Sequence, residues 1–158
     1  MSVQSATDYT TEHGAAVAGA VVDGQVKNIR SGVVTSGALG FGRFCGLNAG
    51  IATPIAAGLI AAGLGGGFVV RTQDDVANSS DVLQKEIGST ASILDFGEVW
   101  VETDEAVATT DSVFVRIAGG NVGMVRSDVD TADAEALPNA RFVTATAGAG
   151  LVKVVFRR

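Results

Sequence analysis

The clearest alternation of apolar and polar residues lies in the segment 92–115. It predicts two strands, at 97–102 and 112–117, joined by a short acidic connector. In each strand the apolar residues share one face: Val99 and Val101 in the first, and Val113, Val115 and Ile117 in the second. A period of two is typical of a half-buried strand, so this part of the chain is expected to pack one face against a core.

Shorter apolar runs bounded by turn residues predict further strands, at 38–44, 68–71, 122–126, 141–145 and 151–156. Residues 25–35 look extended but broken at Ser31-Gly32, and Gly119-Gly120-Asn121 is a hairpin signal. Many short strands with frequent turns favour an all-β sandwich or barrel, here one small domain of short antiparallel strands.

Three segments carry no strand pattern. Residues 1–13 are polar and aperiodic, which predicts an extended N-terminal arm that is ordered only when it docks on something. Residues 51–67 are rich in Gly and Ala and are expected to form a flexible apolar loop, and residues 127–139 look acidic and turn-rich. The predicted organisation is therefore an arm, 1–13, followed by one β-rich domain, 14–158.

The uncharged stretch 44–70 is long enough to raise the possibility of a membrane helix or of a membrane-active segment. Pro54 and a series of glycines interrupt it, Ala outnumbers Leu, and no aromatic belt or basic cluster flanks it. We therefore expect no membrane partner. An exposed apolar segment usually marks an interaction site, which makes this loop a candidate contact.

Trp100 is the only tryptophan and lies between Glu98 and Glu102, on the strand face opposite Val99 and Val101. Two interpretations stay open. Trp100 is either a partly buried surface residue or a residue covered by another subunit, since aromatic side chains are enriched at the centres of interfaces.

The formal net charge of −6 and the scattering of 11 Lys and Arg leave no basic stripe of the kind that nucleic acids require. We expect no nucleic-acid partner. The N-terminus has neither a basic nor an apolar region of a secretory signal, so synthesis in the cytoplasm is expected.

The residues offer little for catalysis. One cysteine, Cys45 in an apolar run, and one histidine, His13 in the arm, form neither a nucleophile–base pair nor a zinc site. The carboxylates at 128–135 lack the spacing of a calcium loop, and those at 102–105 fit a charged turn better than the paired acids of a hydrolase. We expect no enzyme, no cofactor and no metal.

A series of short pieces in a fixed order carries a family resemblance over residues 14–156. The pieces are Asn28-Ile29-Arg30-Ser31, Val34-Thr35-Ser36, Leu39-Gly40-Phe41-Gly42, Phe68-Val69-Val70-Arg71, Ala91 to Leu94, Gly97-Glu98-Val99-Trp100-Val101, Asp111-Ser112-Val113-Phe114-Val115, Pro138-Asn139-Ala140-Arg141-Phe142 and Leu151-Val152-Lys153-Val154. Because these pieces occur in this order, the chain resembles the structural cement, or capsid decoration, proteins of tailed bacteriophages. Thr110-Asp111 stands where the family often has Gly-Asp, and the Ala/Gly loop is longer than expected.

The resemblance implies a structural virion protein on the outer surface of an icosahedral head. Its partners would be the major capsid protein, whose neighbouring subunits it bridges, and further copies of itself in a dimer or trimer. Candidate contact residues lie in the arm, in the loop and on the tryptophan strand: Tyr9, His13, Ile55, Leu59, Leu64 and Trp100. The alternative is another β-rich virion component, such as a head-fibre base or a tail protein.

Overall fold

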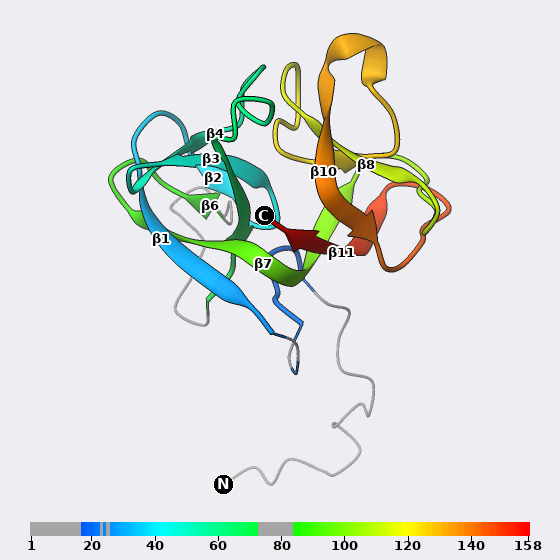
Figure 1. Ribbon diagram of the computed structural model, residues 1–158, viewed down its shortest axis with the longest axis horizontal. Coiled ribbons are helices and arrows are strands. Elements are labelled where there is room, and N and C mark those ends of the chain that lie inside the picture. The colour runs from blue at the N-terminus through cyan, green and yellow to red at the C-terminus, as the bar shows by residue number, and fades with distance from the viewer. Residues whose placement is uncertain (1–16, 23, 25, 73–83) are drawn as a thin grey trace, which may run out of the picture.

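Strands make up nearly all of the regular structure in the part of the chain that the computed structural model describes, residues 17–22, 24, 26–72 and 84–158 (Figure 1). The elements are β1 Asn28–Val34, β2 Leu39–Gly40, β3 Phe44–Asn48, β4 Ile51–Pro54, β5 Gly65–Val70, β6 Gln84–Lys85, β7 Thr90–Thr103, β8 Ser112–Arg116, β9 Val125–Arg126, the short 3-10 turn η2 Asp130–Ala132, β10 Ala134–Phe142 and β11 Gly150–Arg157. The prediction of an all-β fold is confirmed.

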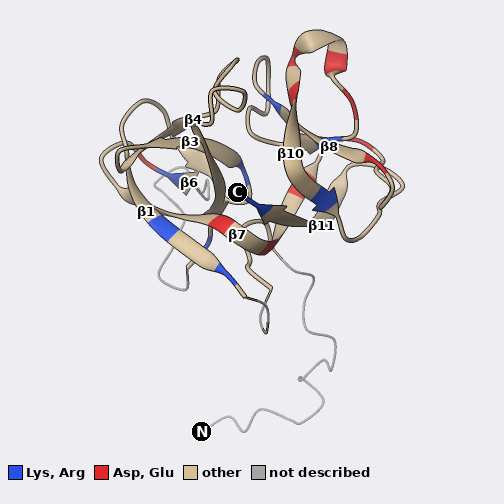
Figure 2. Cartoon of the chain, in the orientation of Figure 1, with Lys and Arg blue, Asp and Glu red and all other residues tan. Residues whose placement is uncertain are grey.

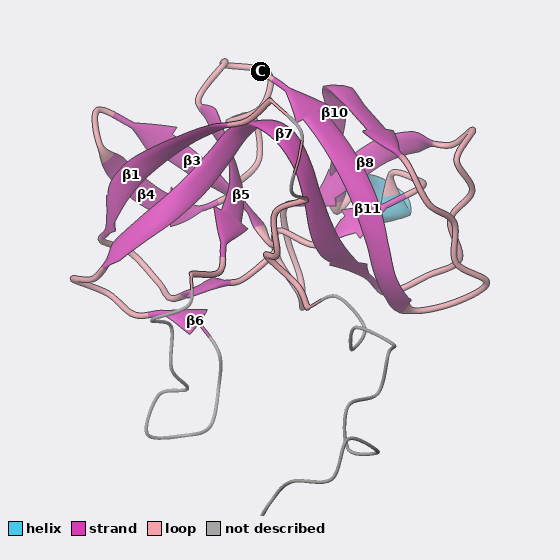
Figure 3. Cartoon of the chain, turned by 90° about the horizontal axis from the view of Figure 1, so that it is seen from below, coloured by secondary structure: helices cyan, strands magenta, loops and turns pink. Residues whose placement is uncertain are grey.

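Strand β7 is the organising element, because two closed sheets share it (Figure 3). Its first half pairs with β1 and β5, and β3 and β4 complete a circuit that we call the first barrel. Its second half pairs with β11, and β10, β8 and β9 return to Thr103 to complete the second barrel. The sheet is mixed, since β1–β4 and β7–β9 are parallel pairs while the others are antiparallel.

The alternation in β7 runs much further than the predicted strand. Its odd-numbered positions from Ala91 to Thr103 are all buried, which confirms that Val99 and Val101 face the core and extends the strand back to Thr90. In β8, Val113 and Val115 are buried as predicted. The alternation is interrupted at Leu94, which is buried as well, so both faces of β7 are covered there and the strand contributes to both barrels.

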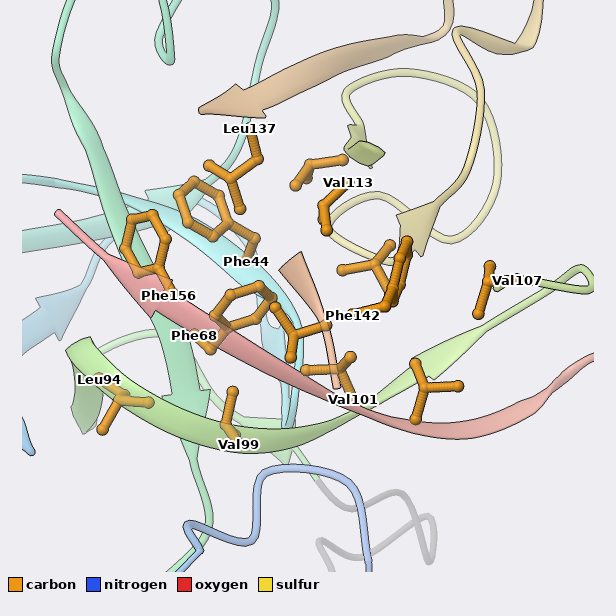
Figure 4. Packing of buried hydrophobic residues seen from close by; sticks show 14 of the residues in the cluster. Phe44, Phe68, Leu94, Val99, Val101, Val107, Val113, Leu137, Phe142 and Phe156 are labelled. Carbon is orange, nitrogen blue, oxygen red and sulfur yellow. The ribbon is translucent and has the colours of Figure 1, made fainter. Parts of the chain in front are cut away.

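Two hydrophobic clusters fill the molecule. The smaller cluster lies within the first barrel and contains Val34, Cys45, Val69 and Ile93. The larger cluster spans both barrels. At its centre the rings of Phe44, Phe68 and Phe156 meet edge to face, with centroid distances of 5.2, 5.5 and 5.9 Å (Figure 4). Such aromatic contacts add to the stabilisation from burial alone, so the packing of one barrel depends on the other.

Three sequence-based expectations were wrong in detail. Residues 28–34 form one unbroken strand through Ser31-Gly32. The predicted loop 51–67 contains β4 and the start of β5, and the predicted acidic turns 127–139 contain most of β10. These segments lack clear alternation because small residues or turn residues occupy their buried positions, and strand pairing in the fold outweighs local preference.

Candidate functional site

The uncharged stretch 44–70 forms one end of the first barrel. Strands β3 and β4, the turn that follows them and the start of β5 surround a groove of about 270 Å³. We call it the uncharged groove, and its lining residues are Gly46, Leu47, Asn48, Ala49, Ile51, Thr53, Leu59 and Leu64. Because no charged side chain lines it, a protein partner can be bound there without the cost of removing charges from water.

The turn at residues 56–64 is held at several points. Within it, Leu59 N–H donates to the Ala56 carbonyl oxygen at 3.2 Å and Leu64 N–H donates to the Leu59 carbonyl oxygen at 2.9 Å. Gly58 N–H donates to Glu135 Oε1 of β10. The second barrel thus fixes a loop of the first, and the predicted flexible loop is a hydrogen-bonded turn over these residues.

Exposed apolar side chains continue from this groove onto the outer face of the first barrel. Val33 of β1 and Ile51 of β4 are register partners, and each is 46% exposed. Ile29 is 42% exposed and lies on the same face of β1 as Val33, while Leu64 at the groove is 36% exposed. These four residues form what we call the apolar stripe: Ile29, Val33, Ile51 and Leu64.

The predicted contact residues fall in different environments. Leu59 is half-buried and Leu64 is exposed, and both line the uncharged groove. Ile55 is only 2% exposed and packs in the larger core cluster, so its side chain lies in the core and not on the surface. Tyr9 and His13 lie outside the described residues.

Trp100 is half-buried, and its own chain covers part of its strand. Residues 17–22 run along the second half of β7, where Gly19 N–H donates to the Trp100 carbonyl oxygen at 2.8 Å and Trp100 N–H donates to the Ala20 carbonyl oxygen at 2.9 Å. The Lys153 ammonium lies 5.5 Å from the centroid of the indole ring, within the range of a cation–π interaction. These contacts within its own chain hold Trp100 in its half-buried position.

Carboxylates from two separate acidic segments converge on two arginines, and the sequence did not reveal this. Arg126 lies 2.9 Å from both Asp104 Oδ1 and Glu105 Oε2, and Arg116 lies 3.0 Å from Asp104 Oδ2 and 2.7 Å from Asp130 Oδ2. Burial disfavours the charged form of Arg126, but the hydrogen bond with Asp128 and the nearby carboxylates outweigh it and raise the pKa of Arg126. The network ties the connector after β7 to the loop after β9.

A second charged region lies at the start of β1. A shallow hollow of about 530 Å³ is lined by Val26, Lys27, Asn28, Arg30, Asp95, Phe96 and Arg158. Asp95 is 8% exposed; it lies 2.8 Å from Arg30 Nε and accepts a hydrogen bond of 2.7 Å from Asn28 Nδ2. Figure 2 shows basic residues on β1, whereas acidic residues concentrate around β8 and β10.

The described residues hold little that suggests reaction chemistry. Cys45 is buried, and burial raises the pKa of its thiol to about 12, which keeps it protonated and unreactive at neutral pH. Residues 17–22, 24, 26–72 and 84–158 contain no cluster of His, Cys, Asp and Glu suited to a metal ion. Across the same residues, no helix has the length and apolar character needed to cross a bilayer.

Comparisons with known proteins point to one family. The model of the family described as "Structural cement protein (E217 gp24/Pam3 gp6)" matches residues 4–157. Among solved structures, a chain from the capsid of Myoviridae phage XM1 is similar at 20% identity with a TM-score of 0.70, covering 100% of this chain and 99% of that chain.

A more distant structural likeness and one negative result complete the comparisons. The N base of the head fibre gp8.5 of bacteriophage phi29 is similar at 10% identity with a TM-score of 0.44, covering 83% of this chain and 94% of that chain. No curated protein sequence matches the chain.

Proposed function

Because the chain belongs to the structural cement protein family, we propose that it binds the outer face of the assembled phage head and bridges neighbouring major capsid protein subunits. The observation that carries this proposal is the family match over nearly the whole chain. The similarity of the fold to a chain from the XM1 capsid supports it.

The mechanism is preferential binding to the assembled shell. A protein that binds the lattice but not separated capsomers stabilises the lattice by mass action. When one molecule or oligomer contacts several capsid subunits, its first contact raises the effective concentration for the next. Modest contacts can therefore add up to a stable clamp.

The uncharged groove and the apolar stripe are the surfaces we assign to capsid contact. They lie on the first barrel, and Leu59 and Leu64 contribute to them. The acidic end of the second barrel then stays exposed to solvent. Apolar surface that is grouped rather than scattered is characteristic of interaction sites.

Residues 14–158 act in this proposal as one capsid-binding unit, because the larger core cluster joins the two barrels. Residues 1–13, with Tyr9 and His13, form an arm that reaches a neighbouring subunit. The protein works as a homodimer or homotrimer on the virion surface, and Trp100 is the candidate residue for contact between subunits.

We also propose that the chain has no enzymatic activity and takes no cofactor, nucleic acid or membrane as a partner. The family is structural, and the single cysteine thiol is buried. The net charge of −6 opposes binding to polyanions, and the uncharged stretch folds as strands and a turn.

The test uses heads assembled without this protein. Adding the purified chain should give cosedimentation with heads but not with unassembled capsid protein, at a copy number that approaches that of the capsid protein. The decorated heads should also release their DNA at a higher temperature. Binding at only a few copies per head would support a fibre base or tail component instead, and failure to bind would refute the proposal.

A further inference from the structure

Within the described part of the chain, strand β1 of the first barrel leaves one backbone edge open next to exposed apolar side chains. We propose that this edge, at Ile29 and Ser31, receives an extended segment of the capsid protein as an added strand. The inferred segment carries apolar residues at alternate positions and a carboxylate near Lys27 and Arg30. This inference rests on the proposed function, because it names the mode by which the cement protein would bind the head.

The hydrogen bonds around β1 show which way its backbone groups point. On the side of β7, Val34 N–H donates to the Ser89 carbonyl oxygen at 2.9 Å. On the side of β4, Val33 N–H donates to the Gly50 carbonyl oxygen at 2.8 Å. Alternate residues of a strand direct their N–H and C=O groups to opposite edges, so Ile29 and Ser31 face the same edge as Val33.

Among the residues that the structure describes, this edge is paired only at its end. The parallel register with β4 begins at Val33↔Ile51, and β4 is preceded by the turn from β3. On the other side, β1 pairs with β7 from Asn28 to Val33. Within the described residues, no strand pairs with Ile29 or Ser31 on the β4 side, and such an edge is a template for one more strand.

The side chains around the edge suit a strand that buries apolar residues. Ile29 and Val33 lie on the outer face of β1 at 42% and 46% exposure, with the exposed Ser31 between them. Ile51 beside Val33 extends the same face. Backbone hydrogen bonds would give the added strand its affinity, and these side chains would select apolar residues at alternate positions.

The charges at the start of β1 specify the polar end of the guest segment. Three cations, Lys27, Arg30 and Arg158, line the hollow there against one carboxylate, Asp95, which pairs with Arg30 at 2.8 Å. Arg158 also donates a hydrogen bond of 3.0 Å to the Gly63 carbonyl oxygen. The sequence from Val26 to Thr72 contains no Asp or Glu, so this segment of the first barrel carries only positive charges in a chain whose net charge is −6. Complementary charge sets register and partner choice, which favours a carboxylate at this position.

Hydrogen exchange on wild-type protein gives the direct test. On binding to heads that lack the protein, the amides of Ile29 and Ser31 should exchange at least tenfold more slowly, whereas Arg30 and Gly32, which face β7, should change little. Unchanged exchange at Ile29 and Ser31 in head-bound protein would overturn the inference. Equally slow exchange in the free chain would also overturn it, because its own residues or a second copy would then occupy the edge.

Paired variants test the same edge by affinity. Ser31→Pro removes the N–H that faces the guest strand, and proline is tolerated on open strand edges. It should weaken head binding at least tenfold, while Ser31→Ala binds as the wild type does. Should Ser31→Pro fail to fold, Val33→Asp replaces it, with the same expected loss. Normal head binding by a folded edge variant refutes the added strand but leaves the proposed function standing. Failure of the wild type to bind heads refutes the proposed function.

Discussion

Gly67 of β5 passes so close to Leu94 of β7 that a Cβ atom on Gly67 would overlap the Leu94 carbonyl oxygen. The next residue, Phe68, is the register partner of Leu94. The missing side chain thus lets β5 join β7 and close the first barrel. Gly67, the last residue of the predicted loop 51–67, is therefore required for the packing of two strands.

Gly67→Ala should therefore destabilise the protein by about 3 kcal/mol, since either the backbone or the β5–β7 pairing must shift. Chemical denaturation followed by circular dichroism measures the change in the free energy of unfolding. Gly148→Ala is the matched control, because a Cβ atom at Gly148 meets nothing within 4 Å. It should change stability by less than about 0.5 kcal/mol, and equal effects of the two substitutions would show that the close approach is not needed.

Arg126 should be important for the second barrel because its side chain is 11% exposed among Asp104, Glu105 and Asp128. Arg126→Met leaves these carboxylates near one another with one cation fewer. Removing one partner from a largely buried ion pair is costly, and we expect a loss of roughly 2–4 kcal/mol in the free energy of unfolding.

The control for Arg126→Met is Arg141→Met, which replaces an exposed arginine of β10 and should have little effect. Because salt screens repulsion among the remaining carboxylates, the loss in Arg126→Met should be smaller at high ionic strength. A loss that does not change with salt would point to packing of the arginine stem instead.

Cys45 gives a prediction for the dependence of stability on pH. Its thiol has a pKa of about 12 in the folded chain, against an ordinary value of 9.0. Between these values the unfolded chain releases a proton that the folded chain keeps, so the stability from this group is complete below pH 9 and falls as pH rises. The decline should approach about 1.4 kcal/mol per pH unit.

Cys45→Ala isolates this effect from other groups that titrate at high pH. The variant loses some packing and is less stable at pH 8, but the difference from the wild type should shrink as pH rises from 9 to 10.5. Urea unfolding at several pH values measures both proteins. A difference that stays constant over this range would mean that the thiol does not titrate as its burial implies.

Strands could be predicted from the sequence where buried residues alternate regularly with exposed ones. They could not be predicted where pairing with distant segments determines the structure. Val99, Val101, Val113 and Val115 are buried as their alternation predicts. The strand at 134–142 was missed because its register partners lie on β8 and β11, which no local pattern encodes. The same limit applies to function, since the arginine network and the open edge of β1 depend on the three-dimensional arrangement of segments far apart in the chain.

Leu64 provides a test of the uncharged groove. Leu64→Asp places a charge at a position that is 36% exposed, so the fold should tolerate the substitution. An interface that buries this side chain should not tolerate it, because the carboxylate would be removed from water. We expect head binding at least tenfold weaker, measured by cosedimentation, with an unchanged melting temperature. Ile87→Asp is the control, because Ile87 is 62% exposed and does not line the groove. Equal binding by both variants would remove the groove from the contact surface.

Two deletions test the N-terminal arm: one removes residues 1–13 and the other removes residues 1–22. Removing residues 1–13 keeps residues 17–22, whose hydrogen bonds to Trp100 and Glu98 cover the second half of β7. The shortened chain should fold with nearly the same melting temperature and bind heads more weakly, because an arm that reaches a neighbour adds a second contact.

Removing residues 1–22 should instead destabilise the fold, because it takes away the pairing of Val21 with Val99 as well as the hydrogen bonds to Trp100. Thermal melting separates the two deletions, and cosedimentation measures head binding of the shorter one. Normal decoration of heads by the chain without residues 1–13 would show that the arm has no part in binding. Capsid contact would then rest on the first barrel alone, where the apolar stripe and the open edge of β1 lie together.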